Sequence, residues 1–291
     1  MSHSHDHMVT PSAHNDEITL SWCSTSKVES LLSKFGARLS PALSDSLTCR
    51  RFLIANKGNI DHTGEALLAT QVWRRAETPW WPAGSTPLSC IDKDISSGKA
   101  YIHGVDGEGA PITWVRASLH DKHEDRASLK HFLAFLNDES VARLPCDKSS
   151  DESTTNSTDA EGMVIVVDFR GFGYSSFDPG AGIAITQMLS SFFPERLKSL
   201  LFVNQPSLFS FFWAIVKPFV DARTTRKIQF VKQEVLSEAL GITLADIPVF
   251  LGGTSTYIYN KNDVQSYETV KMGSLKDLDE AVRASPWGAL E

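Results

Sequence analysis

The second half of the chain alternates short apolar runs with longer segments of helical periodicity, and this alternation is what most restricts the fold. The apolar run Met163–Val167 is typical of a strand covered on both faces of a sheet. A helix is expected at 181–193, a strand at 199–203, a helix at 207–220 and a strand at 228–231. Because strand, helix and strand in series build parallel crossover units, this order predicts an α/β fold with a mainly parallel sheet.

The first part of the chain carries helical periodicity alone. Apolar residues recur at helical spacing over 27–39, 41–55 and 61–76, as in Val28, Leu31 and Phe35. We therefore expect a small helical region at the start of the chain. A Trp pair follows on a connector between Pro79 and Pro82. Packing between parts of the protein is its expected role, and contact with a membrane is the alternative.

A hairpin is expected next. Extended segments at 100–103 and 112–116 flank the turn sequence Asp106–Gly109, and a helix is predicted over 126–144. The following segment, Pro145–Gly162, is rich in Ser, Thr, Asp, Glu and Asn and almost free of apolar residues. Such a segment buries too little apolar surface to offset the entropy of ordering, so we predict a mobile surface loop.

Charge and cysteine usage exclude several classes of protein. The net charge of -7 argues against nucleic-acid binding, which normally needs a basic domain or stripe. The four cysteines match no metal-binding pattern and no apolar signal peptide is seen, so we expect reduced thiols, no metal site and a cytoplasmic location. The apolar stretch 200–220 is interrupted by Asn204, Lys217 and Pro218, which argues against a membrane span.

The glycine-containing turn Asp168–Gly173 follows a buried-type strand, a position where nucleotide-binding turns occur. A dinucleotide fingerprint needs a third glycine at the helix start and a P-loop needs Gly-Lys-Ser/Thr, and neither is present. The chain also has no GxSxG elbow and no HExxH pair. We therefore expect no enzyme, no catalytic residue and no cofactor, and interpret the turn as a strand exit.

The segment 207–220 is apolar on more than one helical face. Such a helix is either buried in a core or faces lipid, and both interpretations remain open from this segment alone. The residues that follow add a local surplus of four positive charges from Lys217, Arg223, Arg226, Lys227 and Lys232 against Asp221. An apolar helix beside a basic rim suits a phosphate headgroup or an anionic bilayer, although an ordinary solvated basic face is the alternative.

Taken in order, these segments resemble the CRAL-TRIO family, which includes retinaldehyde and tocopherol binders and the yeast secretory phosphatidylinositol/phosphatidylcholine transfer proteins. The resemblance covers residues 43–253. Its earlier motifs are Arg51–Lys57, Tyr101–Asp106 and Val167-Asp168 with Gly171. Its most specific motifs are Phe193–Leu197, Val203–Pro206, Lys217–Asp221, Thr224 with Lys227-Ile228, and Ile247-Pro248 with Gly252-Gly253.

The resemblance implies a site for one phospholipid. Lys57, Glu195, Thr224 and Lys227 stand where the transfer proteins hold the inositol phosphate, with donors for phosphate and an acceptor for hydroxyls. A structural ion-pair cluster is the alternative role for these four. The gate helix and cavity residues are expected to be Leu208, Phe209, Phe212, Trp213, Val216 and Phe219. Membrane contact is expected from Arg223 and Arg226.

The resemblance also implies domain limits. We expect a disordered His-containing tail at 1–17, a helical N-terminal region at 18–82, the lipid-binding domain at 95–255 with its polar loop at 145–162, and a C-terminal extension at 256–291. Gly173 stands where transfer proteins present a hydroxyl near the cavity, which argues against phosphatidylcholine exchange.

The expected function is phosphatidylinositol binding and transfer by a monomeric carrier. Its partners would be the phospholipid and, transiently, a membrane surface that it meets as a peripheral protein. Three alternatives stay open: a carrier or sensor for a sterol, a retinoid or haem; an enzyme acting on lipids; and a pure interaction module.

Overall fold

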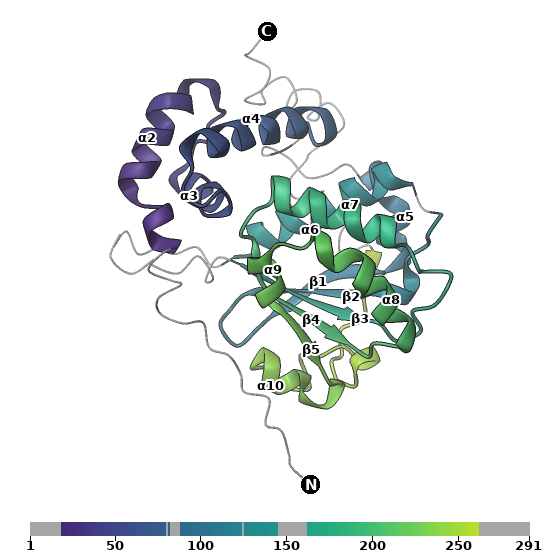
Figure 1. Cartoon of the computed structure of the whole chain (residues 1–291). Coiled ribbons are helices and arrows are strands. Elements are labelled where there is room, and N and C mark those ends of the chain that lie inside the picture. The colour runs from purple at the N-terminus through teal and green to yellow at the C-terminus, as the bar shows by residue number, and fades with distance from the viewer. Residues whose placement is uncertain (1–18, 80, 82–87, 124, 145–161, 262–291) are drawn as a thin grey trace. The chain divides into compact units, whose positions relative to one another are not determined.

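The computed structural model describes residues 19–79, 81, 88–123, 125–144 and 162–261 (Figure 1). The chain divides into two compact units, residues 1–69 and 70–291, and helix α4, Ile60–Glu77, runs through the boundary. The expected tail at 1–17, most of the polar loop at 145–162, Trp80 and most of the C-terminal extension lie outside the described residues.

The first unit is helical, as predicted. It contains α2, Thr25–Phe35, a 3₁₀ turn at Gly36–Arg38, α3, Ser46–Ala55, and the start of α4. The Asp45 carboxylate caps α3 by accepting a hydrogen bond from the Thr48 N–H at 2.9 Å. In α4 a side chain at Gly64 would collide with the Phe35 ring, since its Cβ would lie 2.4 Å from ring carbons. The absence of a side chain at Gly64 therefore lets α4 approach α2 closely.

The second unit is built on a five-stranded sheet. Its strands are β1, Ala100–Val105; β2, Pro111–Arg116; β3, Met163–Asp168; β4, Leu197–Val203; and β5, Ile228–Val231. They lie in the order β1-β2-β3-β4-β5, with β1 antiparallel to β2 and every later pair parallel. The predicted mainly parallel sheet and the predicted hairpin are confirmed.

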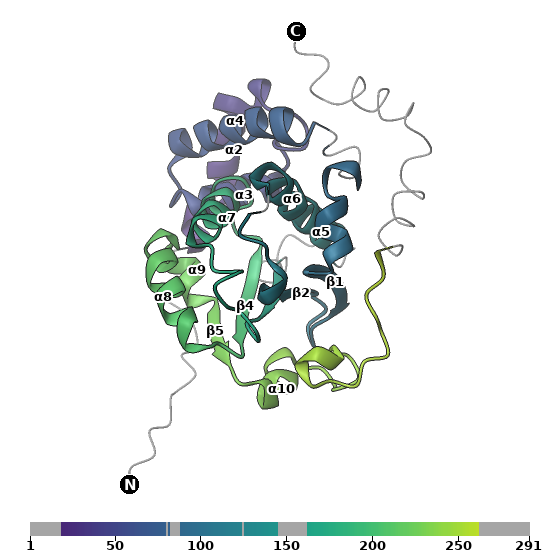
Figure 2. The ribbon, with the colours of Figure 1, turned by 90° about the vertical axis from the view of Figure 1, so that its right-hand side faces the viewer.

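Helices cover both faces of this sheet. They are α5, Asp92–Ser97; α6, Arg126–Ala142; α7, Pro179–Phe192; α8, Ser207–Val216; α9, Ala222–Arg226; and α10, Leu236–Leu240. Further 3₁₀ turns lie at Leu88–Cys90, Ala117–Leu119, Lys217–Phe219, Gln233–Val235 and Val249–Leu251. Figures 1 and 2 show α5 to α8 on one face of the sheet and α10 on the other.

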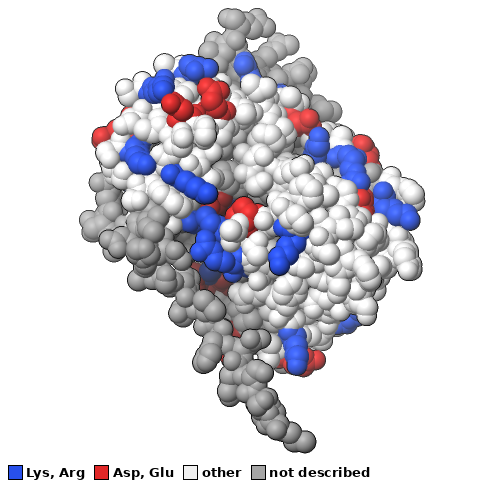
Figure 3. All heavy atoms as spheres, viewed as in Figure 1, with Lys and Arg blue, Asp and Glu red and all other residues white. Residues whose placement is uncertain are grey.

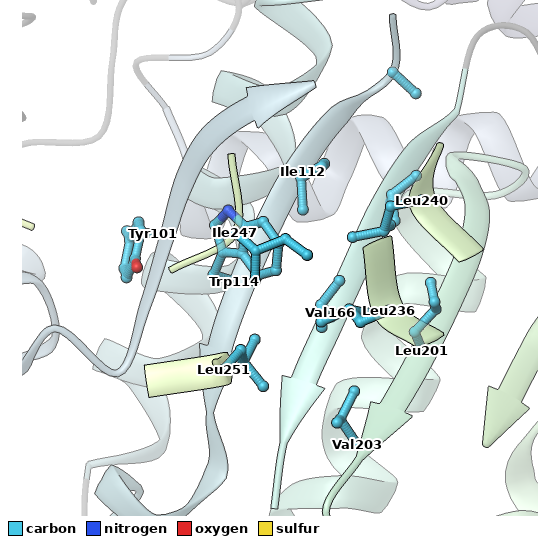
Figure 4. Close-up of a cluster of buried hydrophobic side chains, with 12 residues drawn as sticks. Tyr101, Ile112, Trp114, Val166, Leu201, Val203, Leu236, Leu240, Ile247 and Leu251 are labelled. Carbon is cyan, nitrogen blue, oxygen red and sulfur yellow. The ribbon is translucent and has the colours of Figure 1, made fainter. Parts of the chain in front are cut away.

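The face that carries α10 is densely packed (Figure 4). Alternate residues of the strands point into it, among them Trp114, Val166 and Leu201, which are at most 1% exposed. The Trp114 indole N–H finds a partner in the His103 carbonyl at 2.9 Å, so its polar atom is satisfied. Leu236 and Leu240 of α10 close this core from outside.

The helix expected at 207–220 is shorter than predicted. It ends at Val216 and continues as a 3₁₀ turn over Lys217–Phe219. Pro218 explains the difference, because it has no N–H to donate to the fourth residue before it and its ring clashes with that carbonyl. Within the described residues, no helix combines the length and apolar character needed to cross a bilayer.

Candidate functional site

The sheet face beneath α7 and α8 is packed less completely than the opposite face. Ile165, Val167 and Leu200 point toward these helices from the two central strands and are only half-buried. Residues Ile183 and Ile185 of α7 are half-buried as well, and α7 packs mainly against its neighbours α6 and α8. An apolar face that stays partly open under a layer of helices is suited to an apolar ligand.

Aromatic rings hold α8 to this face. Phe209 contacts Phe169 edge-on, with ring centroids 4.5 Å apart, and Phe212 contacts Phe172 at 5.5 Å. Trp213 lies edge-on to Phe202 of β4 at 5.7 Å. Edge-to-face pairs of this kind contribute about 0.5–1.5 kcal/mol each beyond area burial. Helix α8 is thus attached to this face mainly through contacts between aromatic rings.

The predicted gate residues occupy three environments. Phe209 and Val216 are buried, Leu208, Phe212 and Trp213 are half-buried, and Phe219 is 47% exposed. Phe211 and Ile215 are also exposed, at 69% and 45%. Because residues 211, 215 and 219 recur at four-residue spacing, they form one outward stripe along α8 and the following 3₁₀ turn. A contiguous apolar stripe on a surface marks an interaction site.

A charged cluster lies at the N-terminal ends of β4 and β5. Glu195 precedes β4, and its side chain is only 9% exposed. Arg223 of α9 binds both carboxylate oxygens, with Nε 2.9 Å from Oε1 and Nη2 3.1 Å from Oε2. Lys227 Nζ lies 3.5 Å from Oε2 and donates to the Leu197 carbonyl at 2.7 Å. Figure 3 shows basic side chains gathered around acidic atoms over α9.

Backbone geometry helps to place these groups. Glu195 has φ 55°, the left-handed region that non-glycine residues seldom adopt, and strain of this kind persists only where surrounding contacts enforce it. Asp221 is the N-cap of helix α9, and its carboxylate accepts hydrogen bonds from the N–H groups of Arg223 and Thr224. The short capped helix therefore presents Arg223, Thr224 and Lys227 from one turn of chain.

Thr224 is bonded to the capping residue. Its hydroxyl donates to Asp221 Oδ2 at 2.6 Å, and its carbonyl accepts from the Lys227 N–H at 3.0 Å. Burial alone would raise the pKa of Asp221, but the hydrogen bonds from Thr224 and Arg223 outweigh it and lower that pKa below the ordinary value. Asp221 is therefore a carboxylate at neutral pH and keeps the Thr224 side chain in one orientation.

Of the four predicted headgroup residues, the structure brings three onto neighbouring elements. Glu195 and Lys227 are in contact, and Thr224 lies one helical turn before Lys227. Lys57 belongs to the first unit, where it is exposed in the turn after α3 with φ 52°, and its part in the site stays a prediction. Arg226, predicted to contact membrane, is exposed, with its Nε donating to the Ala222 carbonyl at 3.2 Å.

Arg223 was predicted to contact membrane, which stays a prediction, and its bond with Glu195 was not predicted. Arg223 and Lys227 stand four residues apart, so a helix over this segment indicates a shared face. Their carboxylate partner is 28 residues away from Arg223 in sequence and is brought close by the parallel pairing of β4 with β5. The spacing of basic residues in the sequence therefore predicts that Arg223 and Lys227 share a helix face, but it does not identify the carboxylate that they bind.

Comparison with known proteins gives consistent results. The model of the CRAL/TRIO domain matches residues 95–253. The chain is 28% identical over 231 residues to the phosphatidylinositol/phosphatidylcholine transfer protein SFH12 of Arabidopsis thaliana, covering 74% of this chain and 41% of that protein. It is 28% identical over 173 residues to the phosphatidylinositol transfer protein CSR1 of Eremothecium gossypii, covering 58% and 36%.

The phosphatidylinositol transfer protein SFH5 of Cryptococcus neoformans is 26% identical over 226 residues, covering 73% of this chain and 75% of that protein. The chain spans about two-fifths of the length of SFH12 and of CSR1. A crystal structure of Sfh5 is similar in fold, with a TM-score of 0.56 at 13% identity, covering 91% of this chain and all of that one. The fold predicted from the sequence is confirmed by this likeness.

Proposed function

The chain belongs to the CRAL/TRIO domain family, and from this premise we propose that it binds one phosphatidylinositol molecule and carries it between membranes. The observation that carries the proposal is the contact of Glu195 with Lys227 at the end of a sheet face whose apolar side chains are in part only half-buried. An amphipathic lipid needs a polar site for its headgroup and an apolar surface for its acyl chains, and the charged cluster and this sheet face provide the two.

The headgroup would lie against the charged cluster. Lys227 supplies a cationic donor for the phosphate. The Thr224 hydroxyl donates its hydrogen to Asp221, so its oxygen is available as an acceptor for an inositol hydroxyl. The Glu195 carboxylate is an acceptor for inositol hydroxyls, because two oxygens offer about four acceptor positions. Lys57 is proposed as a further donor from the helical region.

The acyl chains would occupy the space between the sheet and helices α7 and α8. Sheltering apolar chains from water is worth about 0.8 kcal/mol per CH₂ group, so two acyl chains need an enclosed apolar surface throughout transfer. Ile165, Val167 and Leu200 would form the floor, and Phe212 and Trp213 would form part of the cover. This assignment explains why these apolar side chains are left half-buried.

Exchange would require movement of α8. The 3₁₀ turn at Lys217–Phe219 and the residues up to Asp221 form the hinge, because regular α-helical hydrogen bonding ends there. The outward stripe of Phe211, Ile215 and Phe219 and the exposed Arg226 would meet the membrane, where apolar side chains enter the interface and basic ones attract anionic lipids.

We also propose that the protein acts in the cytoplasm as a monomer that meets membranes transiently, and that it performs no catalysis. Cys23, Cys49 and Cys90 form no disulfide in the part of the chain that the structure describes, which fits a reducing compartment. Burial, reinforced by Asp45, raises the pKa of the Cys49 thiol to about 11, so this thiol stays protonated and unreactive.

The test is to identify the ligand and then follow its movement. Protein purified from a eukaryotic expression host is extracted with organic solvent, and native mass spectrometry of the intact complex gives the mass and number of bound molecules. We expect one phosphatidylinositol per chain, and transfer of labelled phosphatidylinositol, chemically unchanged, from donor to acceptor vesicles. A sterol, retinoid or haem in the extract would contradict the proposal, as would conversion of the lipid to products.

A further inference from the structure

Arg223 is bound to the least exposed carboxylate of the charged cluster. Its guanidinium contacts both oxygens of Glu195, whose side chain is 9% exposed, and its own side chain is 25% exposed. Bidentate pairing of this kind fixes both partners in one geometry. Arg223 thus faces inward to the proposed headgroup site, which distinguishes it from the exposed Arg226 on the same short helix.

The pairing sets the charge of the site. Arg223 and Lys227 bring two positive charges and Glu195 one negative charge, so this contact cluster carries a net charge of +1. The negative charge of Asp221 and the positive charge of Arg226, at the two ends of α9, cancel in this count. Arg196, next to Glu195 in the sequence, adds one more positive charge. Without Arg223 the contact cluster of Glu195 and Lys227 would be neutral, and with Arg196 included the local net charge would fall from +2 to +1.

We propose that Arg223 is a specificity-determining residue of the headgroup site, and that its charge selects phospholipids with a monoanionic headgroup over zwitterionic ones. The inference rests on the proposed function and refines its substrate class. A phosphatidylinositol headgroup carries one negative charge on its phosphodiester, which balances the excess charge of the cluster. A phosphatidylcholine headgroup is neutral overall and would bring a quaternary ammonium toward two cations.

The geometry lets Arg223 stay in place while a lipid binds. The bidentate contact of Arg223 and the contact of Lys227 use about three of the four acceptor positions on the Glu195 carboxylate, which leaves about one for a ring hydroxyl. The guanidinium also remains beside Lys227, so a phosphate that binds Lys227 is attracted by both positive charges. Because all three side chains are at most 25% exposed, solvent screens these charges less than on an open surface.

The experiment measures headgroup selection directly. Lipid-free protein is incubated with vesicles that contain equal amounts of phosphatidylinositol, phosphatidylglycerol and phosphatidylcholine, and the bound lipids are extracted and counted by mass spectrometry. We expect the wild type to favour the two anionic lipids and Arg223→Gln to lower their ratio to phosphatidylcholine about tenfold, the effect of about 1.4 kcal/mol. Arg223→Lys, which keeps the charge, should stay within about threefold of the wild type.

Lys130→Gln is the matched control for removal of one positive charge. Lys130 is exposed on α6, which packs over β1 and β2, whereas α9 packs beside β5 at the opposite edge of the sheet. Its lipid ratio should equal that of the wild type. An Arg223→Gln protein that keeps the wild-type ratio would overturn the inference while leaving the proposed function intact. A wild type that takes up only phosphatidylcholine would overturn both.

A second variant separates charge from folding. Removing Arg223 alone leaves a poorly exposed carboxylate without its bidentate partner, which can destabilise the protein. The double variant Glu195→Gln/Arg223→Gln removes both charges and restores the net charge of +1 through Lys227. Its ratio of phosphatidylglycerol to phosphatidylcholine should lie within about threefold of the wild type if net charge governs selection. A ratio near one would contradict the proposal.

Discussion

Arg74 donates two hydrogen bonds to the carboxylate of Asp138, from Nη1 to Oδ2 at 2.8 Å and from Nη2 to Oδ1 at 2.9 Å. The guanidinium also lies over the rings of Trp81 at 4.2 Å and Phe193 at 4.6 Å. Phe193 stands two residues before Glu195. This buried contact therefore joins the end of α4 and helix α6 to the turn that carries the proposed headgroup carboxylate.

Arg74→Ala should destabilise the protein by about 3–5 kcal/mol, because it leaves the Asp138 carboxylate without its buried partner and removes packing on two rings. Urea unfolding followed by tryptophan fluorescence measures the loss. The exposed neighbour Arg75 is the control, and Arg75→Ala should change the stability by no more than about 0.5 kcal/mol. Equal losses in the two variants would contradict this role for Arg74.

Lys227→Ala should abolish phosphatidylinositol transfer while the folded yield stays normal. The change removes the cationic donor beside Glu195, and hydrogen bonds to charged groups are worth about 1.5–3 kcal/mol, so binding should weaken at least tenfold. The measurement is the initial rate of labelled phosphatidylinositol transfer between vesicles, with the circular dichroism spectrum as the test of folding.

Lys232→Ala is the control for this change. Lys232 is exposed directly after β5, whereas Lys227 directly precedes that strand, so the two lysines lie at opposite ends of β5. Its transfer rate should match the wild type. Thr224→Asp should act like Lys227→Ala, because it adds a negative charge beside Asp221. Loss of folding without a change in specific transfer activity would indicate that the cluster is purely structural.

Much of the fold follows from hydrophobic periodicity. The strands of the sheet and helices α2, α3, α4, α6, α7 and α8 are long or apolar enough to show a period, and all were predicted within a few residues. Helices α9 and α10 are five residues each and α5 is six, which is too short for a periodic signal. A capping residue such as Asp221 is the main local signal for elements of this length.

The site was predictable only in part. The resemblance to a known family indicated Glu195, Thr224 and Lys227, and the sheet brings them onto adjacent elements. The partners of buried charges were missed, since Arg74 and Asp138 are 64 residues apart and meet only through tertiary packing. Ion pairs of this type can be predicted only when the relative positions of the helices and strands are known, and the sequence pattern alone does not give those positions.

Stability should fall as the pH drops from about 7.5 to about 5.5, through the ordinary histidine pKa near 6.5. Burial lowers the pKa of His120, although its neighbour Asp178, 3.5 Å away, opposes that effect. Burial likewise lowers the pKa of His103. The unfolded chain therefore takes up these protons before the folded protein does, and acid favours unfolding. Thermal unfolding at several pH values measures the slope of stability against pH.

His120→Gln should reduce this slope, while the contribution of His103 remains. The exposed His123 lies in the same loop and is the matched control, so His123→Gln should unfold with the wild-type pH dependence. A pH dependence that is unchanged in His120→Gln would show that the half-buried imidazole does not control acid stability.

Arg226→Ala should weaken binding to vesicles that contain phosphatidylserine by about fivefold, since one basic residue near an anionic surface contributes about 1 kcal/mol. Arg226 is exposed and lies close in sequence to the apolar stripe that ends at Phe219. Sedimentation with vesicles at low salt measures the change, which should shrink as salt is added. Lys130→Ala is the control and should bind as the wild type does; an equal loss there would indicate a diffuse charge effect.

Gly182→Ala should speed lipid exchange by loosening the contact of α7 with α8. A Cβ at this position would lie 2.9 Å from Phe212 Cζ and 2.9 Å from Val216 Cγ2, so α8 or these two side chains must move. Overpacking of this kind costs about 1–3 kcal/mol, and a penalty confined to the closed arrangement of α8 raises the open population about fivefold or more. The initial rate of phosphatidylinositol transfer is the measurement, with thermal unfolding of the empty protein as the test of overall stability.

Gly180→Ala is the control within the same helix, because its Cβ would meet Arg126 and Asp178 at no less than 3.4 Å, and its transfer rate should match the wild type. If Gly182→Ala transfers lipid at the wild-type rate or more slowly while remaining folded, then separation of α7 and α8 is not the step that admits the lipid.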